Sequence, residues 1–298
     1  MRRWFWVILP ALLCLALGIW FNLSGAKNPL IYLEADLGTL IFGFGVLLSG
    51  VVLIVVLIRD WGEKIRIDLI IQAAEDRRRF LRRLDHELKN PLTAILAGLA
   101  NLSVSETPTD REETLASVQT QVGRLRRLVA ELRKLSELET RSLERGPINT
   151  TEVLQDAFAL AEDLAGASER TLTLSIPRAP WPLPVIQGDR DLLVLAVHNL
   201  LDNAIKFTGP GDRIEMRAFE DGTFVVIEVA DTGPGIPPDE VDHVWEELYR
   251  GEGARGVPGS GLGLALARAI VARHDGSLLL RSRPGEGTVF TLRLPVGN

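Results

Sequence analysis

One histidine has neighbours that suit a nucleophile which a separate partner must reach. His86 lies in a charged, leucine-periodic segment, with Glu87 beside it and Asn90 four residues later. On a helix, His86 and Asn90 share a face opposite the apolar seam, so the imidazole points outward and a partner can reach it as a nucleophile. The seam residues are Leu81, Leu84, Leu88, Ile95 and Leu102. The alternative is an ordinary solvated face of a coiled coil.

A second set of polar residues follows a helical spacing further along the chain. Asn199, Asn203 and Lys206 fall at i, i+4 and i+7, with the apolar side expected to be formed by Leu200, Ala204 and Phe207. Two amides and an ammonium on one face suit a hydrated Mg²⁺ ion and a polyphosphate, because Mg²⁺ prefers oxygen ligands and keeps several waters. Alone, the pattern fits a solvated helix face equally well.

Two glycine-containing clusters complete the chemistry-bearing residues. Asp231 follows a strand and precedes Gly233 and Gly235, so its carboxylate can accept the amine of adenine while the glycines admit a flat base. Gly261 and Gly263 open the last predicted helix, where free amides suit a phosphate. The first cluster is also consistent with a plain Gly-Pro turn. The string Gly-x-x-x-x-Gly-Lys-Ser/Thr is absent, and no strand precedes Gly261 as a dinucleotide fold requires.

A helical hairpin is expected to carry His86. Charged helical periodicity predicts one helix over residues 61–102, and a second follows the loop at 105–110, with Asp110 or Thr109 as its N-cap. The apolar positions of the second helix are spaced 3-4-3-4-3, at Leu115, Val118, Val122, Leu125, Val129 and Leu132. One hairpin cannot bury so wide an apolar stripe, so we expect a homodimeric four-helix bundle.

The C-terminal half alternates between helices and strands and predicts an α/β sandwich with a mainly antiparallel sheet. Gly146-Pro147 ends the helical pattern and begins this domain. Helices are predicted over residues 151–165, 189–207 and 261–274, and strands over 171–176, 213–219, 223–230, 277–283 and 288–294. His198, His243 and His274 are expected to be ordinary helix residues, the last at a helix C-terminus where the dipole favours positive charge.

The N-terminus predicts two transmembrane helices. Residues 4–23 and 37–58 are uncharged, apolar and long enough to cross a hydrocarbon core of ~30 Å. Arg2 and Arg3 precede the first run and Arg59 follows the second, which predicts that both termini face the cytoplasm. A cleavable signal peptide is the alternative for the first run. The expected domains are a membrane region at 1–60, a helical hairpin at 61–145 and an ATP-binding domain at 146–298.

Composition excludes several other classes. Among the 298 residues there is one cysteine, Cys14, so the chain has neither an intrachain disulfide nor a cysteine metal cluster. The four histidines lack the spacing of a zinc site, and a net charge of −6 argues against nucleic-acid binding.

In their order and spacing these clusters resemble the boxes of membrane-bound bacterial sensor histidine kinases of two-component systems. The segment around His86 is similar to the H-box, and the clusters at Asn199, Asp231 and Gly259 are similar to the N, G1 and G2 boxes. Residues 244–250 resemble the F-box, with Trp245 where phenylalanine is usual. The resemblance covers residue 80 to the C-terminus. A further departure is Asp275, where the family often has glycine.

The resemblance implies that His86 accepts the γ-phosphoryl group of ATP, that Glu87 takes the other ring proton, and that Asn90 orients water in a phosphatase reaction. It further implies nucleotide contacts from Lys206, Asp231, Gly233, Gly235, Arg250, Gly261 and Gly263, with Asn203 and Asn199 as Mg²⁺ ligands. The implied partner is the receiver domain of a response regulator, and the implied location is the bacterial inner membrane. A short external loop suggests sensing in the membrane or through a partner membrane protein.

Three other functions remain to be weighed. An ATP-driven chaperone of this fold would typically have glutamate where Asn199 stands, and a serine/threonine kinase of the anti-sigma type would lack the hairpin. The remaining alternative is an ATP-binding membrane signalling scaffold of the same fold without kinase activity. A degraded set of boxes would indicate the scaffold, and here the boxes are intact.

Overall fold

The computed structural model describes residues 37–103, 107–140, 142–164, 166–176, 182–254 and 256–296. They belong to two compact units, residues 1–72 and 73–298. The described part of the first unit is the beginning of helix α2 (Leu37–Leu102). Within the described residues, no helix has both the length and the apolar character that a membrane span requires. The predicted run at 4–23 lies outside these residues, and the run at 37–58 forms the start of α2.

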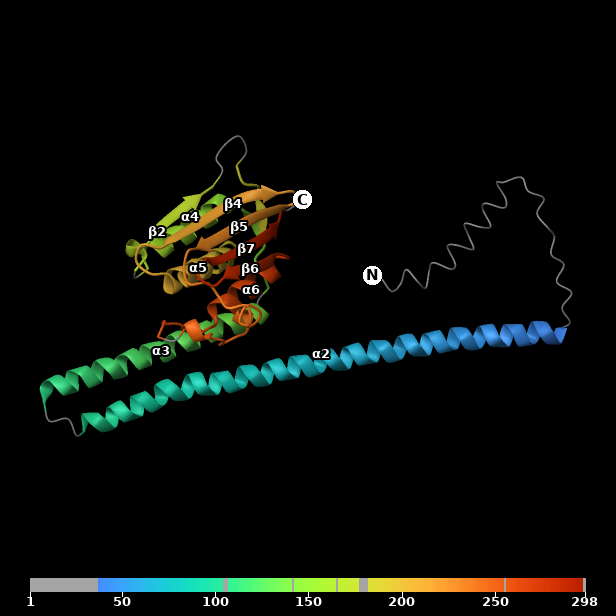
Figure 1. Ribbon diagram of the computed structural model, residues 1–298, viewed down its shortest axis with the longest axis horizontal. Helices are drawn as coiled ribbons and strands as arrows, with labels where there is room; N and C mark the ends of the chain where they lie inside the picture. The colour runs from blue at the N-terminus through green and yellow to red at the C-terminus, as the bar shows by residue number, and fades with distance from the viewer. Residues whose placement is uncertain are drawn as a thin grey trace. The chain divides into compact units, whose positions relative to one another are not determined.

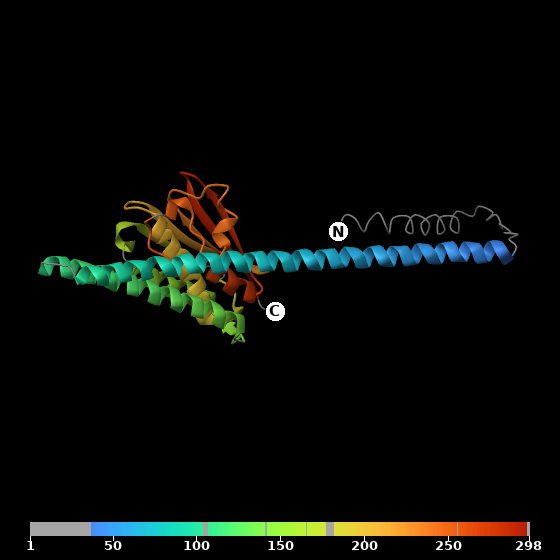
Figure 2. The same ribbon diagram turned by 90° about the horizontal axis from the view of Figure 1, so that it is seen from below.

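The predicted helical hairpin is present in the second unit. The later part of α2 and helix α3 (Pro108–Thr140) run antiparallel (Figures 1 and 2). They approach closely at Gly98, where an added Cβ would lie 2.6 Å from a methyl of Val118. Arg124 of α3 also donates to the Glu87 carboxylate of α2 at 2.8 Å. Close packing at Gly98 and an ion pair at Glu87, beside His86, therefore join the two helices.

Both hairpin helices begin earlier than predicted. The first was expected at residue 61, but the preceding apolar run continues into it without a break, so one helix starts at Leu37. The predicted cap at Asp110 or Thr109 is wrong. The hydroxyl of Thr107 accepts the Asp110 amide at 3.1 Å, and Pro108 occupies the first turn, where its missing N–H costs nothing.

A five-stranded sheet covered by helices forms most of the rest of the second unit. Its strand order is β2-β4-β5-β7-β6, with β2 and β4 parallel and the other pairs antiparallel. The strands are β2 (Thr171–Ser175), β4 (Arg213–Asp221), β5 (Phe224–Asp231), β6 (Ser277–Arg283) and β7 (Gly287–Pro295). The helices are α4 (Thr150–Glu162), α5 (Arg190–Phe207) and α6 (Gly263–Arg273). The predicted α/β sandwich is confirmed.

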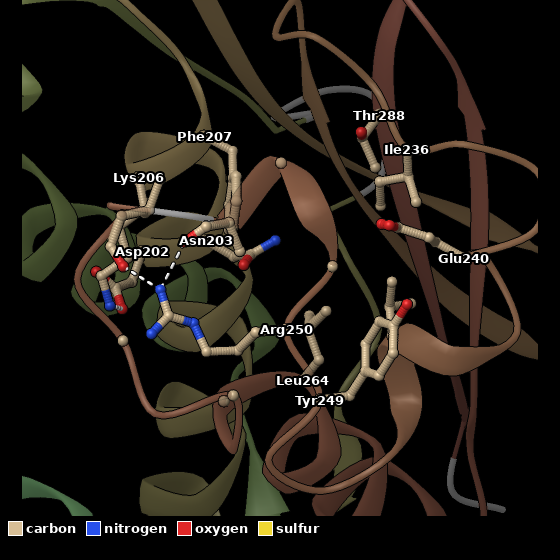
Figure 3. Close-up of a pocket in the computed structure, with 18 of the residues that line it drawn as sticks. Asp202, Asn203, Lys206, Phe207, Ile236, Glu240, Tyr249, Arg250, Leu264 and Thr288 are labelled. Atoms are coloured by element: carbon tan, nitrogen blue, oxygen red, sulfur yellow. Dashed lines mark hydrogen bonds and ion pairs between the residues drawn. The ribbon is translucent and has the colours of Figure 1, made fainter. Parts of the chain in front are cut away.

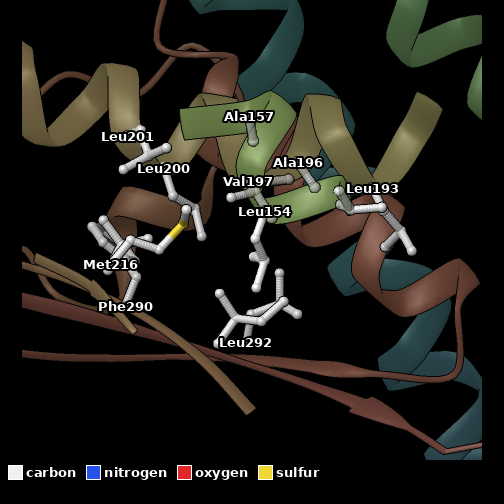
Figure 4. Packing of buried hydrophobic residues seen from close by; sticks show 14 of the residues in the cluster. Leu154, Ala157, Leu193, Ala196, Val197, Leu200, Leu201, Met216, Phe290 and Leu292 are labelled. Carbon is white, nitrogen blue, oxygen red and sulfur yellow. The ribbon is translucent and has the colours of Figure 1, made fainter. Parts of the chain in front are cut away.

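The hydrophobic core lies between the helices and the sheet. Leu200 of α5 points toward Met216 of β4, and Leu154 of α4 points toward Leu292 of β7 (Figure 4). The buried apolar residues of α5 recur every three or four positions, so one face of the helix packs against the sheet and the opposite face is free for other contacts. Burying a leucine side chain stabilises by about 1.5–3 kcal/mol, so this packing holds α5 rigidly.

Short elements escaped prediction. Strands β1 (Gly146–Ile148) and β3 (Ile186–Gly188) form a separate two-stranded antiparallel sheet. The described residues also include the single-turn 3₁₀ helices η1 (Ala167–Glu169), η2 (His243–Trp245) and η3 (Glu252–Ala254). Three residues cannot show a periodicity, so the sequence pattern carries no signal for them.

Candidate functional site: a pocket on α5 and an exposed histidine

A cavity of about 390 Å³ opens beside α5, at the end of β5 and under the loops that follow it. Figure 3 shows Lys206 and Asp202 on one side and Ile236, Glu240 and Thr288 on the other. Of the predicted nucleotide residues, Asn199, Asn203, Lys206, Asp231, Gly235, Arg250, Gly261 and Gly263 line this cavity. Four sequence segments that are far apart in the chain therefore meet at one site.

Helix α5 presents its polar face to the cavity. Asn199 donates from Nδ2 to the Leu195 carbonyl at 2.9 Å, so its Oδ1 atom points toward the start of α6, 3.3 Å from where a Cβ on Gly263 would lie. Lys206 pairs with Asp202 at 2.5 Å. Phe207 was expected on the apolar side but lines the cavity, because it lies at the edge between the two stripes.

Asp231 ends β5 and is only 9% exposed. Its Oδ1 atom accepts the Gly233 amide at 2.9 Å, and burial raises the pKa of the carboxyl. Gly233 does not line the cavity but allows close approach, since an added Cβ would lie 2.7 Å from the Phe207 carbonyl oxygen. A buried carboxylate with unused acceptor capacity suits an amine donor of a flat ligand.

The glycine turns require glycine for steric reasons. Gly235 has a φ of 72°, and an added Cβ would lie 2.1 Å from the Arg283 carbonyl oxygen. Gly261 has a φ of 79° and would place a Cβ 2.6 Å from the Tyr249 carbonyl oxygen. Arg250 holds the neighbouring loop, because its Nη2 donates to the Ala254 carbonyl at 2.6 Å.

The candidate phosphoacceptor lies on the exposed face of α2. His86 and Asn90 are both exposed, while Leu84 and Leu88 are half-buried, as the heptad pattern predicted. Glu87 points toward α3, where it accepts the hydrogen bond from Arg124. The prediction that His86 faces outward is therefore confirmed. The Glu87 carboxylate next to it is oriented by Arg124.

Contacts between the hairpin and the α/β domain were not predicted. Leu128 of α3 is buried against Leu248 and Leu262, next to the cavity. Arg83, one turn before His86, donates to the Glu246 carboxylate at 2.6 Å. Burial alone would raise the pKa of Glu246, but hydrogen bonds from His243 and Arg83 outweigh it and lower that pKa. Such long-range contacts leave no mark in local sequence patterns.

Several residues of the cavity were missed by sequence reasoning. They include Glu131, Asp202, Phe207, Ile236, Glu240, Tyr249 and Thr288. A signal existed for Asp202, which lies between Asn199 and Asn203 on the same helix face. For Glu131 and Thr288 there was none, because each comes from an element remote from the four clusters, and Glu240 follows the Asp231 cluster without a spacing that marks it.

His274 corrects one sequence expectation. It was predicted to carry charge at a helix C-terminus, but it is 3% exposed. Its Nε2 accepts the Asp189 amide at 2.9 Å, so Nδ1 donates to the Ile270 carbonyl at 2.8 Å. Burial lowers the pKa of His274, and the neutral ring ties α6 to the residue that caps α5.

The other two histidines are half-buried or exposed. Burial lowers the pKa of His198; Asp202 opposes this shift, and Lys206 and Lys134 add to it. His243 lies in η2, not on a longer helix face, and its Nδ1 is 2.7 Å from the Glu246 carboxylate.

Comparison with known proteins finds relatives of two parts of the chain, the α/β domain and the helical hairpin. Residues 188–298 match the family described as histidine kinase-, DNA gyrase B-, and HSP90-like ATPase, and residues 76–141 match the His Kinase A (phospho-acceptor) domain. The sensor-like histidine kinase SenX3 of Mycobacterium tuberculosis is 37% identical over 226 residues, covering 74% of this chain and 54% of SenX3. The signal transduction histidine-protein kinase BaeS of Escherichia coli is 32% identical over 224 residues, covering 74% and 47%. The chain thus spans about half the length of these curated relatives.

Solved structures agree in fold. Full-length ShkA in complex with AMPPNP matches with a TM-score of 0.54 and 26% identity, covering 73% of this chain and 46% of that one. Histidine kinase ThkA in complex with the response regulator protein TrrA matches with a TM-score of 0.61 and 22% identity, covering 74% and 61%. At that identity the second likeness shows the fold alone.

Proposed function

Since the chain belongs to the bacterial two-component sensor histidine kinases, we propose that it phosphorylates itself on His86 with ATP and passes the phosphoryl group to an aspartate of a response regulator. One observation carries the proposal. A single compact unit contains an exposed histidine on a helical hairpin and a cavity lined by polar helix residues, a buried carboxylate and obligatory glycines.

The cavity fits a nucleotide. Its volume of about 390 Å³ lies in the range of small-molecule sites. Gly235 and Asp231 line the cavity together, and the Asp231 carboxylate is an acceptor for the adenine amine. Tyr249 and Ile236 line the cavity as apolar walls. The start of α6 presents backbone amides that suit phosphate oxygens.

The residues also fit Mg²⁺. Asn203 and Asn199 line the cavity, and the Asn199 amide hydrogen bond to Leu195 leaves its oxygen directed toward the start of α6. Mg²⁺ keeps several waters, so one or two protein oxygens and the phosphates suffice. When bound, the ion would neutralise negative charge on the phosphates.

The proposed chemistry is an in-line phosphoryl transfer. A neutral imidazole nitrogen of His86 forms a bond to the γ-phosphorus as the bond to the β–γ bridging oxygen breaks, and ADP leaves. The proton on the other ring nitrogen goes to Glu87 or to water. The aspartate of the regulator then attacks the phosphorus, and the N–P bond breaks. Asn90, exposed one turn after His86, is proposed to orient water for hydrolysis of the regulator's acyl phosphate.

Homodimerisation is proposed from the hairpin surface. Large apolar side chains are exposed along both helices of the single chain, at Leu81, Leu92, Leu96, Leu99, Leu115, Val122 and Val129. A contiguous apolar stripe of this kind is typical of an interface. A four-helix bundle of two hairpins would bury it.

The proposed location is the bacterial inner membrane, with the catalytic part in the cytoplasm. Support comes from the apolar runs at 4–23 and 37–58 and from the basic residues Arg2, Arg3 and Arg59 that flank them. The proposed domains are a membrane region (1–60), a helical hairpin (61–145) and an ATP-binding domain (146–298). The stimulus is proposed to arise in the membrane or from a partner membrane protein.

The test is incubation of the full chain in detergent with γ-labelled ATP and Mg²⁺, for wild type, His86→Gln and His243→Gln. We expect acid-labile, alkali-stable label in the wild type and in His243→Gln, and none in His86→Gln. ATP binding without label in any of them would favour the scaffold. Acid-stable label would indicate a serine or threonine acceptor and overturn the proposal.

A further inference from the structure

A carboxylate of the hairpin reaches the nucleotide cavity. Glu131 of α3 lines the cavity together with Asn199, Gly261 and Gly263. Its Oε2 atom accepts a hydrogen bond from the Ser260 hydroxyl, which lies next to the glycine turn before α6. An acidic side chain of one domain thus lies at the proposed phosphate end of a site that the other domain builds.

Hydrophobic packing holds Glu131 in this place. Leu128 and Leu132, which flank it within one turn of α3, pack with Leu248 and Leu262 of the ATP-binding domain. Leu128 is 4% exposed and Leu262 only 1%. The carboxylate is therefore positioned by a buried cluster, and its place does not depend on the serine contact alone.

The single donor of the Ser260 hydroxyl is used in this arrangement. It accepts the Leu262 amide at 3.1 Å and donates to Glu131. Helix α6 begins directly afterwards at Gly263, and no side chain caps its first turn. The carboxylate therefore lies close to the amides on which the terminal phosphate is proposed to bind.

The electrostatic balance of the cavity makes this carboxylate unfavourable for a polyphosphate. The charged lining residues among those described are Glu131, Asp202, Asp231, Glu240, Lys206 and Arg250. Lys206 is already paired with Asp202, and Arg250 donates to backbone carbonyls. Both cationic side chains thus already have partners in the protein, and a terminal phosphate would meet the negative charge of Glu131 in addition.

We propose that Glu131 is a nucleotide-discriminating residue: while α3 packs on the ATP-binding domain, its carboxylate disfavours a triphosphate relative to a diphosphate. The inference rests on the proposed nucleotide site. The γ-phosphate must displace Glu131 from Ser260, whereas a diphosphate ends before reaching it. Triphosphate binding and the α3 contact are then coupled, and each weakens the other.

The test is titration of the full chain in detergent with AMPPNP and with ADP, each with Mg²⁺, by calorimetry. Glu131→Gln keeps an oxygen acceptor for Ser260 and removes only the charge. We expect AMPPNP to bind at least about fivefold more tightly, the Coulomb effect of unit charges about 4 Å apart in water. The ADP affinity should change less than about twofold, because the diphosphate lies farther away.

The matched control is Glu137→Gln on the same helix, an exposed residue whose carboxylate pairs with Arg133. It should leave both affinities unchanged. Thermal melting of each variant shows that it is folded. Equal changes for AMPPNP and ADP, or weaker AMPPNP binding in Glu131→Gln, would overturn the inference. Failure of the wild type to bind either nucleotide would instead refute the proposed function.

Discussion

Replacing His274 by phenylalanine should loosen the helix that carries the nucleotide residues. The ring is 3% exposed and bridges the Asp189 amide and the Ile270 carbonyl at 2.9 and 2.8 Å. Phenylalanine fills the space but accepts no hydrogen bond, so the Asp189 amide loses its partner. The Ile270 carbonyl keeps a backbone donor, the His274 amide at 3.2 Å, and is affected less.

The magnitude follows from that one orphaned donor. A buried amide without a partner costs about 1–3 kcal/mol. A loss of about 2 kcal/mol corresponds to a fall of about 4–8 °C in the melting temperature of a domain of about 150–250 residues. Asp189 also caps α5 through the Leu192 amide at 3.3 Å, so its displacement weakens the first turn of that helix.

The assay combines thermal melting with hydrogen exchange of the full chain. We expect a lower melting temperature and faster exchange at the amides of residues 189–193 in His274→Phe. The control His243→Phe changes an exposed ring and should shift stability by less than about 0.5 kcal/mol. An unchanged melting temperature together with unchanged exchange at Asp189 would refute the conclusion that the hydrogen bonds of His274 hold α6 against the start of α5.

Three further predictions follow from the same geometry. Burial lowers the pKa of His274 and His198 below 6.5, so below that pH the unfolded chain binds more protons than the folded chain. The free energy of unfolding should therefore fall as the pH drops from 6.5, and it should fall less steeply in His274→Phe. Denaturant titrations at several pH values would measure this. Asp231→Asn should weaken ATP binding by about tenfold or more, since it removes a charged acceptor, while GTP binding in the same competition assay should change little. Gly235→Ala should destabilise by more than about 2 kcal/mol, because strain adds to a clash with a facing carbonyl, whereas Gly222→Ala, at positive φ in open space, should lose only about 1 kcal/mol in the same melts.

Local sequence pattern was enough for the main elements and for most of the site. The amides and ammonium of α5 repeat at helical spacing, so the sequence alone predicts that Asn199, Asn203 and Lys206 share one face, and all three line the cavity. The heptad seam likewise predicts that His86 faces outward, and its side chain is exposed. These features depend on the period of a helix, which the order of residues determines directly.

The tertiary structure decided what those elements meet. Glu131 lies in the cavity because leucines of α3 pack beside the turn before α6, and Arg83 binds Glu246, 163 residues away. His274 is neutral and buried because α6 packs against the start of α5, whereas its helix position alone had indicated a charge. Burial and long-range contact determine such properties, and neither is encoded in the spacing of residues along one element.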